Sequence, residues 1–403
     1  MMTLAACIAG AGAQTIKGGW TICTRDLRLR ETLIERANER ELTLMNSYGI
    51  RSVMPMDEVL FVVKTAPDQP AIPGEIVGVP SPEPSPVRLI TLTDGQTVRG
   101  SIIESDLPEY LGINLIAGMK MHGDAHVSLE RVLRIVDQDV RDPHPPAELL
   151  DDLVVLRNGD RVSGFVESIG PVVRVALDDT AIELESARIQ QIHIANESAP
   201  LDGIYLRFAD REVIRVLGFR YSAQSPIEIS VDPVSLGMLE TGHTEWRLNS
   251  GSLDSLWVSA PGQRVVSLAS IEPEDIEPVG GRAWVPTPIV LNENATHEAL
   301  RSIDFRSPAR VSYPLPEGAS RFACSIEVPI EEWTDCVLRV ITVGSGRERQ
   351  IFEQRMRLDA STASINTSLP QGVDSIIIEI DPGEHGPIQD RVIMHHPRVL
   401  AGE

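Results

Sequence analysis

The stretch VVLRNGDRVSGFV, residues 154–166, carries the pattern that decides the fold. Apolar and polar residues alternate on both sides of Asn158-Gly159, as they do in strands with one buried face. An Asn-Gly pair between two such strands predicts a β-hairpin, because both central residues of a type I′ turn need positive φ angles. The alternative is a loop that presents Asp160 and Arg161 to a ligand.

A sister stretch, LITLTDGQTVRGSII at residues 89–103, distinguishes these two interpretations. In it Asp94-Gly95 takes the place of the Asn-Gly pair, and a turn-permissive glycine follows at the same offset. The acidic position does not recur, because Gln96 stands where the first stretch has Asp160. A ligand-binding side chain would be expected to recur, so the repetition favours a structural hairpin.

The match continues downstream of both hairpins and predicts a repeated unit of about five short strands. An open sheet of five short strands would bury little apolar surface and would leave two edges unpaired. Each unit is therefore expected to curl into a small SH3-like or Sm-like barrel. The expected units are residues 20–64, a degenerate copy without the Asp-Gly turn, then 88–138, 152–196 and an expanded fourth copy at 202–280. Proline-rich linkers at 65–87 and 139–151 separate the first three.

The spacing of strand-like segments changes after the fourth unit, and the pattern of residues 285–400 predicts a β-sandwich of jelly-roll type. Alternating apolar segments bounded by turn residues are found at 309–316, 321–329, 336–344, 349–358, 363–371, 375–383 and 390–400. The chain is therefore expected to be all-β, with tandem small β-barrel repeats followed by a C-terminal sandwich.

Three stretches of this last region carry a resemblance to a known family. They are SPARVSYPLPEGASRFACSIEVP (307–329), VLRVITVGSGRERQIFEQRM (337–356) and SIIIEIDPGEHGPIQDRVIMHHPRVL (375–400). Together they resemble the NPCBM/NEW2 modules, which are jelly-roll carbohydrate-binding modules often appended to exported glycoside hydrolases. The resemblance implies the jelly-roll fold and sugar binding. His395-His396 stand where family members carry an aromatic residue near the ligand, so the fold is expected to carry over better than the binding.

A polar loop in this module offers a candidate sugar site. Exposed Trp333 could stack on a pyranose ring while Glu331 and Glu332 accept hydrogen bonds from its hydroxyls. His396 is a further candidate, and neighbouring strand residues point to opposite faces, so only one histidine of the pair can contribute. The alternative is that Trp333 fills one end of the sandwich core.

The sequence offers one candidate metal site and no catalytic motif. Asp381, Glu384 and Asp390 lie in one loop and could hold a structural calcium ion. No Cys/His spacing resembles a zinc site, and no nucleophile, P-loop or metalloprotease motif is present. The protein is therefore expected not to be an enzyme.

The start of the chain and its charge suggest where the protein works. Ala11-Gly12-Ala13 resembles a signal-peptidase site that would remove residues 1–13, and the preceding LAAC would instead allow lipidation of Cys7. We expect export to the periplasm, cell surface or medium, with the absence of a signal as the alternative. There Cys324 and Cys336 could form a disulfide or stay free buried thiols.

The remaining bulk properties exclude some partners. A net charge of −22 disfavours nucleic acid, and no apolar run approaches the ~20 residues of a membrane span. The sequence thus predicts a non-catalytic exported protein that binds carbohydrate or cell-surface polysaccharide through its C-terminal module. The alternatives are a scaffold that joins envelope proteins without binding sugar and an accessory chain of a glycoside hydrolase complex.

Overall fold

The computed structural model describes residues 19–402 except for 47, 66–85, 116–123, 141–148, 178–179, 200–201, 209–210, 224, 232–244, 249–252, 260–262, 282, 294, 296, 307, 330–333 and 385–389. Within this part the regular elements are β-strands and single-turn 3₁₀ helices, and the strand pairings are antiparallel. The all-β prediction is confirmed. No helix of the described part is long and apolar enough to span a bilayer.

The first unit consists of five strands wound around an apolar core. The strands are β1 (Trp20–Thr24), β2 (Leu29–Asn38), β3 (Glu41–Met45), β4 (Arg51–Pro55) and β5 (Val59–Lys64), with the 3₁₀ turn η1 (Met56–Glu58) before the last. β1 pairs with both β2 and β5, which gives the order β5-β1-β2-β3-β4. A register shift between Ile34 and Arg36 interrupts the long strand β2, as bulges that bend a strand do.

The second and third units repeat this arrangement. Unit 2 contains β6 (Val87–Leu92), β7 (Thr97–Ile102), β8 (Tyr110–Leu115), β9 (Asp124–Ser128), η2 (Leu129–Arg131) and β10 (Val132–Asp137). Unit 3 contains β11 (Asp152–Leu156), β12 (Arg161–Ile169), β13 (Val172–Leu177), β14 (Thr180–Glu185), η3 (Ser186–Arg188) and β15 (Ile189–His193). In each unit the first strand pairs with the second and the last, as in unit 1.

The predicted hairpins are confirmed, but the glycine that follows each turn has a different role from the one expected. β6 pairs with β7 and β11 with β12, and the turn residues Gly95 and Gly159 have φ angles of +78° and +91°. Asp94 and Asn158 have no positive φ angle, so the predicted type I′ turn is wrong and each pair requires the left-handed region at its glycine alone. Gly100 and Gly164 lie inside strands. A Cβ atom on Gly100 would come within 2.4 Å of Ile113 Cγ2, and one on Gly164 within 2.4 Å of the Ala176 carbonyl oxygen. These positions require glycine because the neighbouring strand crosses closely, not because the chain turns.

The fourth unit ends earlier than predicted. Its strands are β16 (Gly203–Phe208), β17 (Val213–Val216), β18 (Gly218–Ser222), β19 (Ser225–Ser230), β20 (Glu245–Leu248) and β21 (Leu253–Ser259). β16 pairs with β17 and β21, so the unit closes at β21 rather than near residue 280. The next strands, β22 (Gln263–Ser267) and β23 (Asp275–Pro278), pair instead with strands of the C-terminal sandwich.

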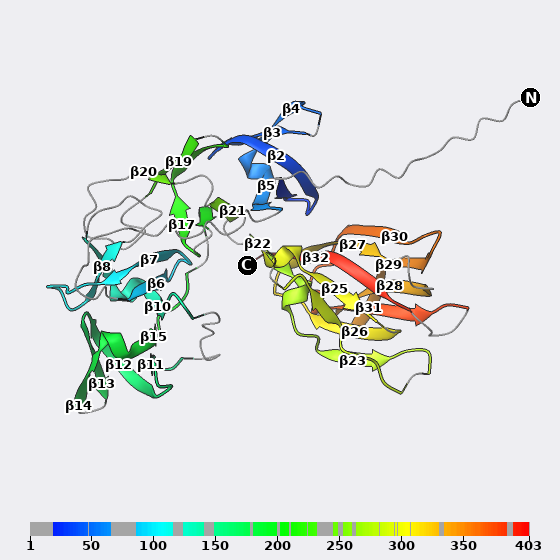
Figure 1. Ribbon diagram of the computed structural model, residues 1–403. Coiled ribbons are helices and arrows are strands. Elements are labelled where there is room, and N and C mark those ends of the chain that lie inside the picture. Colours follow the sequence, from blue (N-terminus) through cyan, green and yellow to red (C-terminus); the bar gives the residue numbers. More distant parts are fainter. Residues whose placement is uncertain are drawn as a thin grey trace, which may run out of the picture.

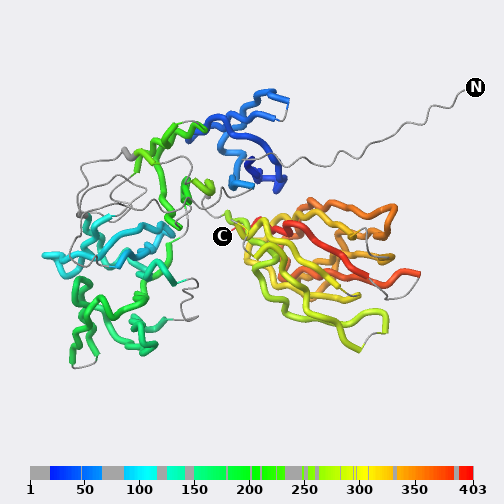
Figure 2. The backbone as a smooth tube through the Cα atoms, in the orientation of Figure 1, coloured from blue at the N-terminus to red at the C-terminus, as the bar shows by residue number. Residues whose placement is uncertain are grey.

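The last strands of the four units form two contacts of the same kind. β5 of unit 1 pairs with β21 of unit 4 around Val62 and Leu256, and β10 of unit 2 pairs with β15 of unit 3 around Ile135 and Ile192. Each of these four residues is the fourth of its strand, so both contacts have the same local two-fold symmetry. The chain therefore returns from unit 3 to the side of unit 1 before it enters the sandwich, as Figure 2 shows.

The C-terminal region is a sandwich of two antiparallel sheets (Figure 1). One sheet has the order β24-β25-β32-β27-β30 with β22 also on β32, and the other has the order β23-β26-β31-β28-β29. The bounds are β24 (Ile289–Leu291), β25 (Ser302–Phe305), β26 (Ala309–Pro314), β27 (Ala319–Glu327), β28 (Asp335–Gly344), β29 (Arg347–Arg357), β30 (Thr362–Ser368), β31 (Ser375–Pro382) and β32 (Val392–Gly402), with the 3₁₀ turns η5 (Leu268–Ser270) and η6 (Glu298–Leu300). The seven strands predicted after residue 308 are all present.

The sandwich is docked onto unit 1 through a second, smaller core. Cys23, Leu27 and Phe61 of unit 1 pack with Ala323 and Leu400 of the sandwich in one buried apolar cluster. Polar contacts flank the cluster: the Asn366 side-chain amide donates to the Asp26 carbonyl oxygen over 2.7 Å. The first and last strands of the described part of the chain, β1 and β32, therefore meet at this joint.

Candidate functional site

The cleft beside this joint is the candidate functional site. It has a volume of about 1040 Å³ and lies between the β1–β2 corner of unit 1 and the outer face of strands β30, β27 and β32. Asn292, Glu293 and Ala295 form part of its lining. It exists only because the two units dock, so it joins surfaces that lie more than 220 residues apart in the sequence.

The floor of the cleft is a row of small polar side chains. Ser325 of β27 pairs across the sheet with Ser364 of β30, and both are exposed. Within the described part of the chain neither hydroxyl has a hydrogen-bond partner in the protein. Asn366, two residues further along β30, is held by its contact with unit 1 and by Arg321, whose Nε donates to the amide oxygen over 2.7 Å.

His396 is brought into the cleft by an irregularity of the last strand. The register of β27 against β32 shifts between Ala323 and Ser325, opposite His396-Pro397, and His396 has a φ angle of +51°. Its backbone N–H donates to the Arg301 carbonyl oxygen over 3.1 Å. Burial, followed by the nearby Arg398 and His395, lowers the pKa of His396 to about 4, so the ring is neutral near pH 7.

Arg398 is a buried cation at the edge of this floor, and its side chain lines the cleft. Only 6% of the residue is exposed. Its Nε donates to the Leu27 carbonyl oxygen over 3.1 Å, its Nη2 donates to the same oxygen, and its Nη1 donates to the His396 carbonyl oxygen over 2.6 Å. Burial lowers its pKa, and within the described residues no carboxylate forms an ion pair with it.

The rim of the cleft carries charges of both signs. Arg28, Arg30 and Lys64 are its basic side chains, and Glu31 and Glu293 are its acidic ones. Arg28 pairs with Asp26 at 2.9 Å, outside the lining. Because the whole chain has a net charge of −22, a cleft in which basic groups outnumber acidic ones differs from the average surface of the protein.

Of the four predicted sugar-binding residues, the structure places one. His396 lines the cleft, whereas Glu331, Glu332 and Trp333 lie outside the described residues. Its neighbour His395 points to a different set of partners, since Nε2 lies 3.0 Å from Glu327 Oε2 and Nδ1 lies 3.3 Å from Ser302 Oγ. The Trp333 site therefore stays a prediction.

The three predicted calcium ligands have separate protein partners. Asp381 forms an ion pair with Arg339 at 3.1 Å, and Glu384 forms one with Arg355 at 3.2 Å. Asp390 is buried and faces the backbone N–H of Asp335. In the described part of the chain no three acidic, histidine or cysteine side chains converge on a metal position. Residues 385–389 of the loop are not described, so the calcium site also stays a prediction.

The cysteines are free thiols in the structure. Cys324 lies in β27 and Cys336 in β28, so they belong to opposite sheets of the sandwich, and Cys23 lies in β1. Burial raises the pKa of each of these thiols to about 12, which makes them unreactive near neutral pH. Of the two alternatives, free buried thiols describe this pair. Cys7, the predicted lipidation site, lies outside the described residues.

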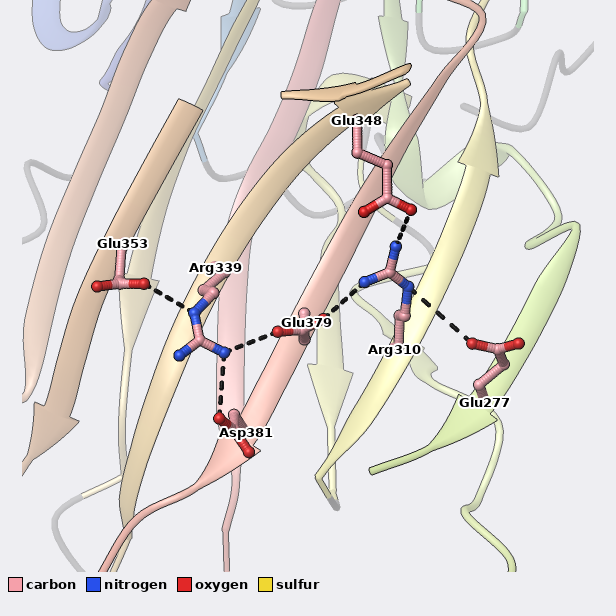
Figure 3. A network of polar contacts seen from close by, with 7 residues as sticks. All are labelled: Glu277, Arg310, Arg339, Glu348, Glu353, Glu379 and Asp381. Atoms are coloured by element: carbon pink, nitrogen blue, oxygen red, sulfur yellow. Dashed lines mark hydrogen bonds and ion pairs between the residues drawn. The ribbon is translucent and has the colours of Figure 1, made fainter. Parts of the chain in front are cut away.

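The outer face of the second sheet is a ladder of ion pairs rather than a binding platform. Glu277, Arg310, Glu379, Arg339 and Glu353 are cross-strand neighbours on the five successive strands, so the charge alternates along one row (Figure 3). The row is held by distances of 2.7 Å from Arg310 to Glu379, 2.8 Å from Arg339 to Glu379 and 2.7 Å from Arg339 to Glu353. Its carboxylates and guanidinium groups are already paired, which leaves the cleft as the better site for a ligand.

The proteins similar to this chain are found among solved structures rather than among sequence relatives. No family model matches the sequence, and no curated protein matches it. Among solved structures, CBM51 from Clostridium perfringens GH95 in complex with methyl-galactose is 12% identical, with 34% of this chain and 99% of that one covered and a TM-score of 0.26. CBM51-2 with the INT domains of C. perfringens ZmpB, in complex with GlcNAc, is 14% identical, with 44% and 38% covered and a TM-score of 0.27. The tandem CBM51 modules of Sp3GH98 from Streptococcus pneumoniae SP3-BS71 are 10% identical, with 78% and 88% covered and a TM-score of 0.27. These structures are carbohydrate-binding modules, but likeness at this level assigns no function to this chain.

Proposed function

We propose that this protein is a non-catalytic carbohydrate-binding protein whose C-terminal sandwich holds a saccharide in the cleft against unit 1. The observation that carries the proposal is the exposed Ser325–Ser364 pair on the floor of a cleft large enough for a small ligand. Hydroxyl groups that have no protein partner can both donate to and accept from sugar hydroxyls. Leu29 and Leu300 add apolar surface for the C–H faces of the ring.

The carboxylates at the cleft support binding without hydrolysis. Glycoside hydrolases need two carboxyl groups that flank the scissile bond, one of which is kept protonated by its surroundings. Glu31 and Glu293 are the carboxylates of the lining, and both are exposed to solvent. Neither carboxyl group lies in the buried, apolar surroundings in which a catalytic acid is held, so neither is placed to act as the general acid.

We also propose that the protein acts outside the cytoplasm. It rests on the resemblance of residues 1–13 to an export signal, with lipidation at Cys7 as the alternative form of attachment. Expression with the native N-terminus, followed by fractionation and mass spectrometry of the mature end, tests both. A mature protein that starts at residue 1 in the cytoplasm would contradict export without affecting the binding site.

A glycan array probed with the full chain tests the binding proposal. We expect binding that is lost in Ser364→Trp, because an indole on the floor fills the cleft. The matched control is Ser368→Trp, on the same strand and also exposed but outside the lining. Ser364→Trp binding as well as the wild type would place the site elsewhere, and Trp333→Ala would then show whether the loop near Trp333 is that site.

A scaffold role is the second candidate, and a specific observation favours it. Two pairs of units are joined by the same symmetric strand contact, centred on Val62 and Leu256 and on Ile135 and Ile192. Repetition of a contact indicates that the units are built to associate. Failure of the full chain to bind any glycan at millimolar concentration, with and without calcium, would favour this role over the first.

A further inference from the structure

Resting on the proposed function, we propose that the ligand of the cleft is an acidic saccharide, whose anionic substituent is bound by Arg398. The substituent is a carboxylate or a sulfate ester, since both present the planar or clustered oxygens that a guanidinium group binds. This names the class of sugar rather than only the place of binding.

The first argument is the uncompensated charge of Arg398. Burying a cation away from water is unfavourable unless a partner of opposite charge accompanies it. Arg398 is only 6% exposed, yet the partners of its guanidinium group are the Leu27 and His396 carbonyl oxygens and the Cys23 thiol. None of these carries a negative charge near pH 7, because the thiol pKa is about 12. A bound anion would supply the missing partner.

The second argument is the position of Arg398 on the floor. Arg398 of β32 pairs with Ala323 of β27, which in turn pairs with Asn366 of β30. The adjacent row of the same face carries Ser325 and Ser364. Neighbouring strands are about 4.8 Å apart and successive residues about 3.4 Å, so the backbone of Arg398 lies about 8 Å from that of Ser325 and about 12 Å from that of Ser364. One sugar residue can therefore reach the cation while its hydroxyls reach the serines.

The third argument comes from the other titratable groups that line the cleft. His396 is uncharged near pH 7 and competes for no anion. Arg30 stands on the rim, exposed and without an ion-pair partner among the described residues, where it can attract a charged ligand. The acidic rim residues Glu31 and Glu293 are solvated and therefore screened by salt.

Calorimetric titration of the full chain with trigalacturonic acid, triglucuronic acid, a sulfated disaccharide and the methyl ester of trigalacturonic acid tests the inference. We expect an acidic member to bind and its neutral counterpart to bind at least 10-fold more weakly. Arg398→Gln should weaken acidic binding by about 10- to 100-fold, as expected for hydrogen bonds to a charged group. The carboxylate and sulfate members distinguish the two sources of the anion.

Two further variants keep the test decisive if Arg398→Gln does not fold. Arg30→Gln, at the exposed rim, should weaken acidic binding and reduce its salt dependence, whereas Arg357→Gln, on the outer face of the other sheet, should change neither. Neutral sugars that bind as well as acidic ones, with no effect of Arg398→Gln or Arg30→Gln, would overturn the acidic-sugar inference and leave the proposed function standing. Binding of no saccharide by any form would overturn both.

Discussion

Arg398, in the last strand of the sandwich, donates hydrogen bonds to the carbonyl oxygen of Leu27, which lies 371 residues earlier in unit 1. Leu27 itself has a φ angle of +59° and a fully buried side chain. A residue held in the left-handed region at the joint aims its carbonyl group at a buried cation. Together with the Asn366–Asp26 contact and the apolar cluster at the joint, this contact ties the two walls of the cleft together. The predictions below test the parts of the structure that hold it in place.

Leu27→Ala should weaken the joint. The side chain packs with Phe61 and Leu400 in the cluster between unit 1 and the sandwich, and a buried leucine replaced by alanine typically loses about 2–5 kcal/mol. The loss should appear as a lower denaturant midpoint for unfolding. Leu358→Ala, at a leucine that is 50% exposed, should change stability by less than about 0.5 kcal/mol. Equal effects of the two substitutions would contradict the role given to Leu27.

Gly100→Ala and Gly164→Ala should each destabilise their unit. The new Cβ atom would lie 2.7 Å from the Asn114 carbonyl oxygen in one case and 2.4 Å from that of Ala176 in the other. Overpacking of this kind typically costs about 1–3 kcal/mol, measurable by thermal unfolding. Gly170→Ala is the control, since its nearest new neighbour would be the Val172 carbonyl oxygen at 3.7 Å. A neutral Gly100→Ala would show that the two strands are further apart.

Glu379→Gln should loosen the ion-pair ladder. Burial raises the pKa of Glu379, but hydrogen bonds from Arg339 and Arg310 outweigh it, so the pKa lies below its usual range. The carboxylate therefore contributes stability above its unfolded pKa, and this contribution is lost as the pH falls through the lower folded pKa. The wild type should lose its advantage over Glu379→Gln on acidification below about pH 4. A difference that persists unchanged at pH 2 would contradict the ladder.

His297 should make the molecule sensitive to mild acid. Its ring stacks on Phe61 at 4.4 Å and meets Trp257 edge-on at 5.5 Å, so it joins unit 1, unit 4 and the sandwich. Burial, then Arg207 and Arg301, lowers its pKa to about 4. A histidine with a lowered folded pKa contributes fully above its unfolded pKa near 6.5, and this contribution is lost as the pH falls towards 4.

The effect of His297 is measured by urea unfolding at pH 7.5 and pH 5. From the two pKa values we expect a loss of about 2 kcal/mol on acidification that is attributable to this residue. His297→Gln, which cannot take up the proton, should lose correspondingly less over the same interval. The lowered pKa of His396 adds an acid sensitivity that His297→Gln retains. Identical pH dependence of wild type and His297→Gln would rule out His297 as the sensitive group.

Local patterns in the sequence predicted most of the fold. The Asp94-Gly95 and Asn158-Gly159 pairs identified the hairpins because each turn needs a residue that tolerates a positive φ angle, and glycine does so most readily. The predicted type I′ geometry was wrong, since Asp94 and Asn158 have no positive φ angle. Alternation identified the seven strands from β26 to β32, since each has one face in the sandwich core. The end of unit 4 was misplaced because alternation shows that a segment is a strand but not which strand it pairs with. The alternating pattern of residues 263–278 is compatible with strands of the fourth repeat. It is equally compatible with the observed pairing to β32 and β26.

The candidate site was less predictable. His396 was singled out, but the serines on β27 and β30 carry no motif, and Arg398 reads as an ordinary strand residue. The cleft depends on the docking of two surfaces from opposite ends of the chain, which no local pattern encodes. The useful signal was HHPR, residues 395–398, where a proline inside an alternating strand indicates an irregularity such as the one that turns His396 towards the cleft.

A crystal structure of the full chain with the best array ligand tests the central claim most directly. The account predicts a saccharide between the β1–β2 corner and the outer face of β27 and β30, with its hydroxyls on Ser325 and Ser364 and an anionic group on Arg398. A saccharide held at the loop around Trp333, with this cleft occupied only by water, would contradict it.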